Sequence, residues 1–261
     1  MKQFVACVKK EFYEFLRGKR FLVYILIAVG MVVMNMGMLA ISKILFEQLE
    51  GSDLDLGLEE INPFSLSISI ADFSSNFISI MMIAVIIILG QSVSSEIKKK
   101  KWLVPICAGI SPSKMIYAKF LVQCSIVSLT TLVSYLLNVL VSITFMEIDV
   151  KVGIVVFTGI SLVIAMTFIS VLTLGISAIT KKTWIAILIP ILLYEILSML
   201  FMTKTGISVY APSFYFYNVA VGAISKFVLH KFLIALLITF GTGGIIVFAS
   251  AKANDGFMKI V

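Results

Sequence analysis

Six long apolar stretches dominate this chain and constrain its fold more than any other feature. Crossing the hydrocarbon core of a bilayer takes about 20 mostly apolar residues. The predicted membrane spans are residues 21–41, 73–93, 115–145, 152–179, 184–201 and 232–250. The first is too long for the apolar part of a signal peptide, and no convincing small-residue cleavage site follows it. We therefore expect six transmembrane helices.

The composition agrees with a membrane protein. The 261 residues are 60% hydrophobic and only 13% charged, whereas a soluble domain carries about a quarter charged residues. Three cysteines give no disulfide framework. The net charge of +7 could suggest nucleic-acid binding, but the basic residues flank the apolar stretches, and membrane topology explains them without such a partner. The predicted fold is an all-α integral membrane protein.

The distribution of lysine and arginine orients the six spans, because these residues concentrate on the cytoplasmic side. With both termini inside, 16 of the 21 basic residues lie in the cytoplasm. The five outside are Lys43, Lys151, Lys204, Lys226 and Lys231. We predict a multi-pass protein of the cell membrane with cytoplasmic N- and C-termini and a cytoplasmic tail at 251–261.

The segment 1–20 has the pattern of an amphipathic helix. At about 100° per residue, six apolar side chains fall on one side of such a helix. They are Phe4, Val5, Val8, Phe12, Phe15 and Leu16. Lys9, Lys10, Glu14 and Arg17 fall on the other. We expect an elbow helix in the cytoplasmic interface, with lysines toward lipid headgroups; a basic anchor that only sets topology is the simpler alternative.

The predicted cytoplasmic loop 94–114 combines four lysines, Lys98 to Lys101, with an apolar run from Trp102 to Ile106. An apolar run is unusual in a solvated loop, and the Ser111–Pro112 pair favours a turn before the next helix. A short apolar helix held off the membrane by basic flanks suits the groove of another protein. The loop is therefore a predicted docking element.

In these features the chain resembles the membrane subunit of an ATP-binding cassette (ABC) transporter of the type-2 export class. That family has an elbow helix before six spans, and its first cytoplasmic loop carries an acidic residue, a hydrophobic stretch, a proline turn with a basic residue, and a lysine in the next span. The residues of this chain that resemble these features are, in order, Glu96, Trp102 to Ile106, Pro112–Ser113–Lys114 and Lys119. The lysine run, and a serine between Pro112 and Lys114, depart from the family pattern.

The resemblance implies a permease that exports a peptide, drug, lipid or ion. A separate nucleotide-binding ATPase would hold ATP and magnesium, and a second permease copy or paralogue would complete the pathway. This chain has no G-x-x-x-x-G-K-[ST] phosphate loop, so we do not expect it to hydrolyse ATP itself, and under the resemblance it is not an enzyme and binds no cofactor directly. It has one histidine, His230, and no H-E-x-x-H pair or cysteine–histidine cluster, so we expect no metal site. The residues implied in ATPase docking are Glu96, Lys98, Trp102, Leu103, Pro105, Ile106, Pro112 and Lys114.

Glu195 is a lone carboxylate in the fifth predicted span, five residues after Pro190. Because a charge within the membrane is costly, Glu195 should face the bundle interior. It is a candidate pathway residue together with Asn35 and Asn138. The alternative is a protonated acid that hydrogen-bonds a neighbouring helix, with those two asparagines as candidate partners.

Two further segments are expected on the outer side. The aromatic stretch Tyr210–Lys231 fits re-entrant helices, as the resemblance implies, or an interfacial belt. The acidic stretch Ser42–Asp72 fits a solvated loop or a cation-attracting surface.

Two other functional classes remain open. One is a non-transporting sensor or immunity subunit, and the other is a glutamate-dependent intramembrane enzyme centred on Glu195.

Overall fold

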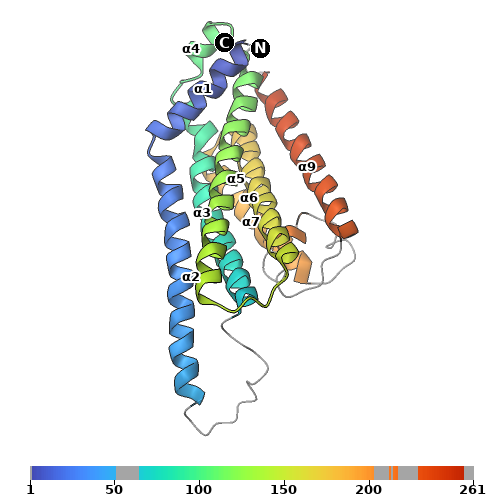
Figure 1. Ribbon diagram of the computed structural model, residues 1–261. Helices are drawn as coiled ribbons and strands as arrows, with labels where there is room; N and C mark the ends of the chain where they lie inside the picture. The colour runs from blue at the N-terminus through green and yellow to red at the C-terminus, as the bar shows by residue number, and fades with distance from the viewer. Residues whose placement is uncertain (1, 51–64, 203–211, 213, 217–228, 256–261) are drawn as a thin grey trace.

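The computed structural model describes residues 2–50, 65–202, 212, 214–216 and 229–255, and these residues form helices and connecting turns (Figure 1). The long helices are α2 (Arg20–Glu50), α3 (Leu66–Lys98), α5 (Pro112–Phe145), α6 (Val152–Thr180), α7 (Thr183–Met202) and α9 (Leu229–Asp255). Two others are α1 (Lys2–Arg17) and the short α4 (Leu103–Cys107). No strand occurs within these ranges, which confirms the all-α prediction for the described part of the chain.

Five helices are long and apolar enough to cross a membrane: α2, α3, α5, α6 and α9. Each contains one of the predicted spans. The predicted span 184–201 lies in α7, whose apolar run Thr183–Leu197 is shorter than the other five. The structure therefore defines a helical protein with five candidate membrane-spanning helices.

Helix α6 is the centre of the bundle and contacts α3, α5, α7 and α9. Its side chains Leu162, Met166 and Leu174 are fully buried. Two glycines allow its neighbours to approach closely. A Cβ at Gly159 would lie 2.6 Å from the ring of Tyr135 on α5, and one at Gly175 would lie 2.2 Å from Ile246 on α9. Close packing of this kind is how helices associate where the surroundings are as apolar as the side chains.

Helix α2 lies at the edge of the bundle, against α3 and α5, and extends beyond them at the end opposite α1 and α4 (Figure 1). The predicted loop Ser42–Asp72 is therefore wrong in its bounds, because α2 continues to Glu50 and α3 begins at Leu66. The apolar run and Ser42, which bonds the carbonyl of Met38, carry α2 past residue 41. Residues 51–64 of this loop lie outside the described part.

At that same end, the chain before α3 is tied to the connection between α5 and α6. The amide of Leu66 donates to the carbonyl of Glu147 at 3.0 Å, and the amide of Ser67 donates to the carboxylate of Asp149 at 3.0 Å. The pKa of Asp149 is lowered, because the hydrogen bonds from Ser67 outweigh a partial burial that would raise it.

Helix α1 follows an oblique path against α5 at the other end (Figure 1). Its buried residues are Cys7, Glu11 and Phe15, which share one face at a spacing of four residues. Val5, Phe12 and Leu16, which the sequence pattern placed on the same apolar side, remain exposed. One part of the apolar side thus packs on the bundle, and the other faces outward.

Candidate functional site

The connection between α3 and α5 is a compact reversal that presents the short helix α4. Lys100 and Gly109 adopt left-handed backbone angles, with φ of 56° and 80°. Gly109 does so without steric cost because it lacks a Cβ. Pro112 then opens α5 in its first turn, where a missing amide hydrogen is no loss. The loop is a defined turn–helix–turn at the end of the bundle.

A buried ion network lies directly beneath this loop, centred on Lys119 of α5. Its side chain is only 2% exposed, and its ammonium lies 2.7 Å from Glu11 of α1 and 2.6 Å from Glu96 of α3. The indole of Trp102 donates to the other oxygen of Glu96 at 3.0 Å. One lysine therefore joins three helices, and through Glu96 it also fixes the start of the loop.

This network is energetically demanding. Two carboxylates around one lysine leave a net negative charge, which Lys10 offsets at 3.4 Å from Glu11. Charges removed from water are tolerated only when they are paired and hydrogen-bonded, and removal of one partner costs about 3–5 kcal/mol. The loop, α1 and α5 are therefore fixed relative to one another.

A second, more exposed layer surrounds the first. Glu14 of α1 binds Lys101 of the loop at 2.8 Å and Lys10 at 3.5 Å. Partial burial alone would raise the pKa of Glu14, but the hydrogen bond from Lys101 and the charges of Lys10, Lys101 and Lys119 lower it. The hydrogen bond to Glu14 in turn raises the pKa of Lys101. Both groups are thus held in their charged forms.

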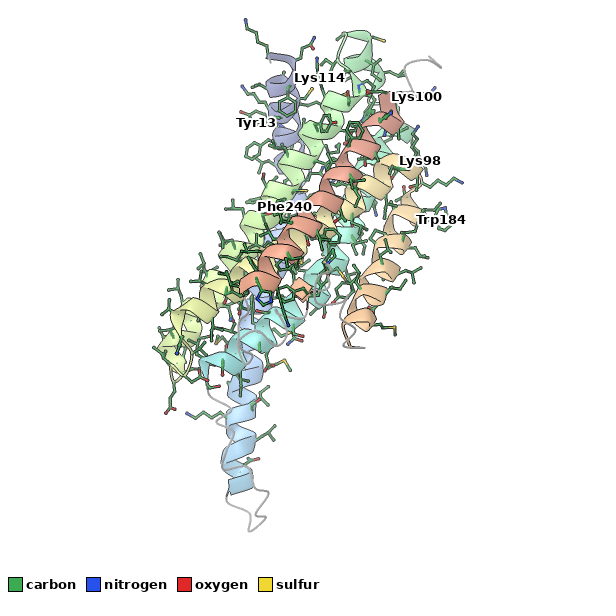
Figure 2. All side chains as sticks on the ribbon, turned by 90° about the vertical axis from the view of Figure 1, so that its right-hand side faces the viewer. Tyr13, Lys98, Lys100, Lys114, Trp184 and Phe240 are labelled. Carbon is green, nitrogen blue, oxygen red and sulfur yellow. The ribbon has the colours of Figure 1, made fainter. Side chains whose placement is uncertain are left out.

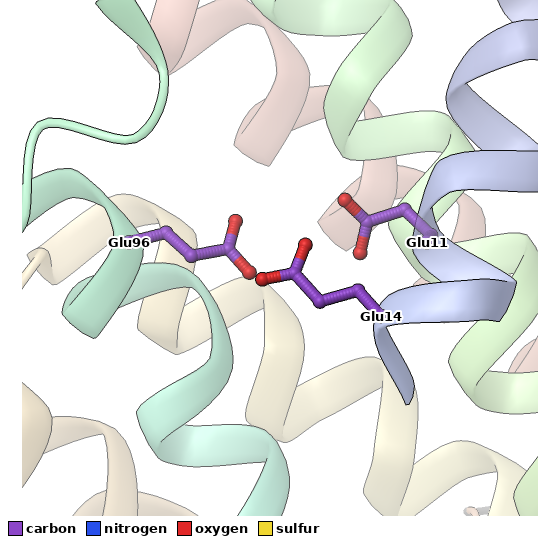
Figure 3. A group of neighbouring side chains, drawn as sticks. All are labelled: Glu11, Glu14 and Glu96. Carbon is purple, nitrogen blue, oxygen red and sulfur yellow. The ribbon is translucent and has the colours of Figure 1, made fainter. Parts of the chain in front are cut away.

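The carboxylates of Glu11, Glu14 and Glu96 point toward one another, with oxygens within 4.8 Å (Figure 3). Three acidic groups at this spacing could bind a divalent cation. Here the ammonium groups of Lys119 and Lys101 already contact all three. The arrangement is therefore that of an ion-pair network among side chains.

The outward face of the loop is apolar at its tip and basic at its base. Val104 is 77% exposed and Leu103 is 37% exposed, whereas Pro105 and Ile106 are half-buried. Lys98, Lys100 and Lys114 lie at this same end (Figure 2). Lys114 also contacts Gln3 of α1 at 2.8 Å. This surface could pack against an apolar groove with an acidic rim.

The structure divides the eight docking residues inferred from the sequence into three groups, of which the half-buried Pro105 and Ile106 are the intermediate one. Lys98, Leu103 and Lys114 are exposed. Glu96, Trp102 and Pro112 are buried within this chain, so their side chains are not available to a partner, and for these three the direct docking prediction is wrong. Trp102 turns inward because its indole N–H finds a buried carboxylate to bond.

Sequence reasoning missed one residue of this site, Glu11, and did not single out another, Val104, from the apolar run Trp102 to Ile106. Glu11 is a partner of Lys119, and Val104 is the most exposed apolar side chain of the loop. A signal for Glu11 exists, because it stands four residues from both Cys7 and Phe15 on the face that packs inward. Val104 has a weaker signal: in a helix it falls on the side opposite Trp102 and Ile106.

Of the three candidate pathway residues, Asn35 and Asn138 lie together, and Glu195 lies apart from them. Asn35 of α2 donates to Asn138 of α5 at 2.9 Å, and to Ser69 of α3, whose hydroxyl lies 2.8 Å from that of Ser142. Glu195 is on the exposed face of α7. Its predicted position in the interior of the bundle is therefore wrong for the single chain, and the two asparagines bond each other instead.

Most of the stretch Tyr210–Lys231 lies outside the described residues. The prediction of re-entrant helices falls on these residues and stays a prediction. Within this stretch the structure describes residues 212, 214–216 and 229–231. Residues 214–216 form a helical turn with three buried aromatic residues, and 229–231 begin α9. The hydroxyl of Tyr215 donates to the carbonyl of Phe232 on α9 at 3.0 Å, and Phe216 packs edge-on against Tyr194 of α7. These aromatics join α7 to α9.

No protein-family model and no curated protein sequence matches this chain. The class is therefore defined by the fold alone: a multi-pass α-helical membrane protein with five long apolar helices. Its site is a loop anchored by a buried lysine at one end of the bundle.

Proposed function

We propose that this chain is the membrane permease subunit of an ATP-driven exporter of the ABC type. In this proposal loop 94–114 is the coupling element on which a separate nucleotide-binding ATPase docks. The observation that carries the proposal is the construction of the loop: Val104 projects from α4, while Trp102, two residues earlier, is bonded into the Glu96–Lys119 network. A partner that displaces α4 would thereby displace α3 and α5.

The proposed topology has six spans, with α7 as the shortest, and both termini in the cytoplasm. The end of α9 supports this topology. Asn254 donates to the carbonyl of Ala178 on α6, and Asp255 accepts from the amide of Ser113 at the start of α5. Helix α9 therefore ends beside the basic loop, and α1 begins there, since its Gln3 contacts Lys114. The positive-inside rule assigns this lysine-rich end to the cytoplasm.

Helix α1 is the proposed interfacial elbow. Its inward face carries Glu11 into the ion network, and its outward side chains Val5, Phe12 and Leu16 would enter the headgroup boundary. A second permease copy or a paralogue completes the proposed pathway. The proposed energy source is ATP hydrolysis on the partner, and the helix bundle is the element that changes conformation.

Docking is tested with a photo-reactive amino acid at Val104 in the cells that make the protein. We expect a cross-link to a protein carrying an ATP-binding phosphate loop. The matched control is Ile148 at the opposite end, an apolar residue that is 66% exposed, where Val104 is 77% exposed. A photo-reactive amino acid at this position should give no such cross-link. If position 104 formed no cross-link to any ATP-binding protein, the assignment would be refuted.

The functional test replaces the tip residue. Val104→Glu should abolish permease-dependent ATPase activity of the reconstituted complex, because an unpaired carboxylate would enter an apolar contact, whereas Val104→Leu should preserve it. A hydrolysis-deficient ATPase separates transport from the sensor alternative, since sequestration of a ligand would survive the loss of hydrolysis. Intact activity in Val104→Glu would remove the coupling role from α4.

A further inference from the structure

A polar cavity of about 510 Å³ lies beside the ion network, where α1 passes into α2. It is lined by Lys10, Tyr13, Glu14, Arg17, Arg20 and Lys101, with Gly18 at the turn. Four cationic side chains and one carboxylate give this lining a net charge of +3. Lys10, Glu14 and Lys101 belong also to the outer layer of the ion network, whereas Arg17 and Arg20 take no part in that network or in the proposed coupling.

The carboxylates of the described residues neutralise the cavity's positive charge only in part. Glu14 is already shared between Lys10 and Lys101. Arg17 and Arg20 form no ion pair with any carboxylate of the described residues. Guanidinium groups are planar forks of donors that match the oxygens of a phosphate, often two at a time. The cavity therefore offers two unpaired phosphate-binding groups next to two lysines.

The turn between the helices fixes the position of these two arginines. Helix α1 ends at Arg17 and α2 begins at Arg20, and the amide of Gly18 donates to the carbonyl of Glu14 at 3.0 Å. A Cβ at Gly18 would lie 3.0 Å from that carbonyl oxygen and 3.9 Å from Arg20. Lys19 has a φ of 56°, which completes the reversal. The turn thus places Arg17 and Arg20 close together, and both residues line the same cavity.

The surroundings of the cavity are those of a membrane interface. Phe12 and Leu16 of α1 are 47% and 40% exposed, and exposed apolar residues of α2 begin at Phe21, directly after Arg20. Tyr13, at the wall of the cavity, points outward from α1 (Figure 2). In a bilayer this boundary coincides with the level of lipid phosphates, where basic pockets bind anionic headgroups.

We propose that this cavity binds the phosphate group of an anionic membrane lipid, held by Arg17 and Arg20. The inference rests on the membrane placement of the proposed function, but not on transport or on an ATPase partner. The bound lipid would lie between α1, α2 and Lys101, and would hold the elbow helix against the loop.

Native mass spectrometry of the full-length chain tests the proposal, with phosphatidylglycerol and phosphatidylcholine as probes. We expect selective retention of phosphatidylglycerol, and at least about tenfold weaker retention by Arg17→Gln/Arg20→Gln, since two charge-assisted contacts are lost. Lys98→Gln/Lys100→Gln removes the same charge from the same end outside the cavity and should change retention less than about twofold.

A second variant separates binding from folding. Arg17→Lys/Arg20→Lys keeps the charge but loses the forked geometry, so we expect a folded chain with intermediate retention. Equal retention of both lipids, or equal loss in the two glutamine variants, would overturn the proposal. Displacement of the lipid by excess inorganic phosphate would assign the cavity to soluble phosphate instead and would overturn the lipid assignment. All of these measurements use the chain without an ATPase, so failure of the permease proposal leaves them interpretable.

Discussion

Two of the buried polar networks among the described residues differ in charge and in what they join. The network around Lys119 is ionic and ties α1 and the α4 loop to α3 and α5. The network around Asn35 is neutral and ties α2 to α3 and α5. Charge is therefore used where peripheral segments are attached at one end, and amides and hydroxyls where apolar helices contact each other. The difference follows from the cost of placing charge in hydrocarbon.

The largest effect should come from Lys119→Met, which leaves two carboxylates buried without their cation. We expect a loss of about 3–5 kcal/mol in the free energy of unfolding, measured by denaturant titration in detergent. The combined change Glu11→Leu/Glu96→Leu/Lys119→Met removes all three charges and should recover most of this loss. A Lys119→Met variant as stable as the parent would contradict the ionic network.

A smaller effect is expected from Trp102→Phe, which keeps the buried ring but removes the donor to Glu96. A hydrogen bond to a charged group contributes about 1.5–3 kcal/mol. Loosening of α4 should appear as faster amide hydrogen exchange at 103–107, while the amides of α6 keep their protection. Unchanged exchange in α4 would show that the indole does not anchor the loop.

Asn35→Leu tests the neutral network and should have a smaller effect again. Hydrogen bonds between helices in membranes average about 0.6 kcal/mol, with a maximum near 1.7. We therefore expect a decrease in unfolding free energy of about 1 kcal/mol in the same titration, well below that of Lys119→Met. If the two losses were equal, the comparison between the two networks would fail.

The smallest effect concerns the exposed Glu14–Lys101 pair. Because the folded-state pKa of Glu14 is lowered, its contribution to stability is present above its unfolded pKa and is lost as the pH falls through the lower, folded value. Between about pH 6 and pH 3.5, Glu14→Gln should therefore reduce the acid-induced fall in Tm slightly, since water screens a pair this exposed. A variant whose Tm falls just as steeply with acid would show that the pair contributes nothing.

The sequence predicted the helices well because a bilayer-spanning helix needs only length and apolarity, and each predicted span lies within an observed helix. It did not predict which faces pack. Glu11 and Lys119 are 108 positions apart, and their pairing depends on α1 folding back onto α5. Helix α7 is apolar on all sides, so nothing in its pattern indicates the face that Glu195 occupies.

The docking residues show the same limit within one short loop: the sequence located the loop but not the direction of its side chains. Charge and apolarity located the loop 94–114, and helical periodicity places Val104 opposite Trp102. The bond between Trp102 and Glu96 then shows that Trp102 is the side chain that faces inward and Val104 the one that faces outward. The hydrogen bond that Glu96 accepts depends on α3 ending beneath the loop, which is a tertiary feature. Side-chain direction in a five-residue helix is decided by tertiary contacts.

The central claim, that the α4 loop lies in the cytoplasm, can be tested with a cysteine that the chain already contains. Cys107 at the end of α4 is exposed, while Cys7 is buried and Cys124 partly buried. In a background with Cys7 and Cys124 replaced by serine, a membrane-impermeant maleimide should leave Cys107 unlabelled in intact cells and label it after permeabilisation. As a control, Cys107 is also replaced by serine and Ile148→Cys is introduced. The new cysteine should react in intact cells. Labelling of Cys107 in intact cells would place the loop outside and contradict the account.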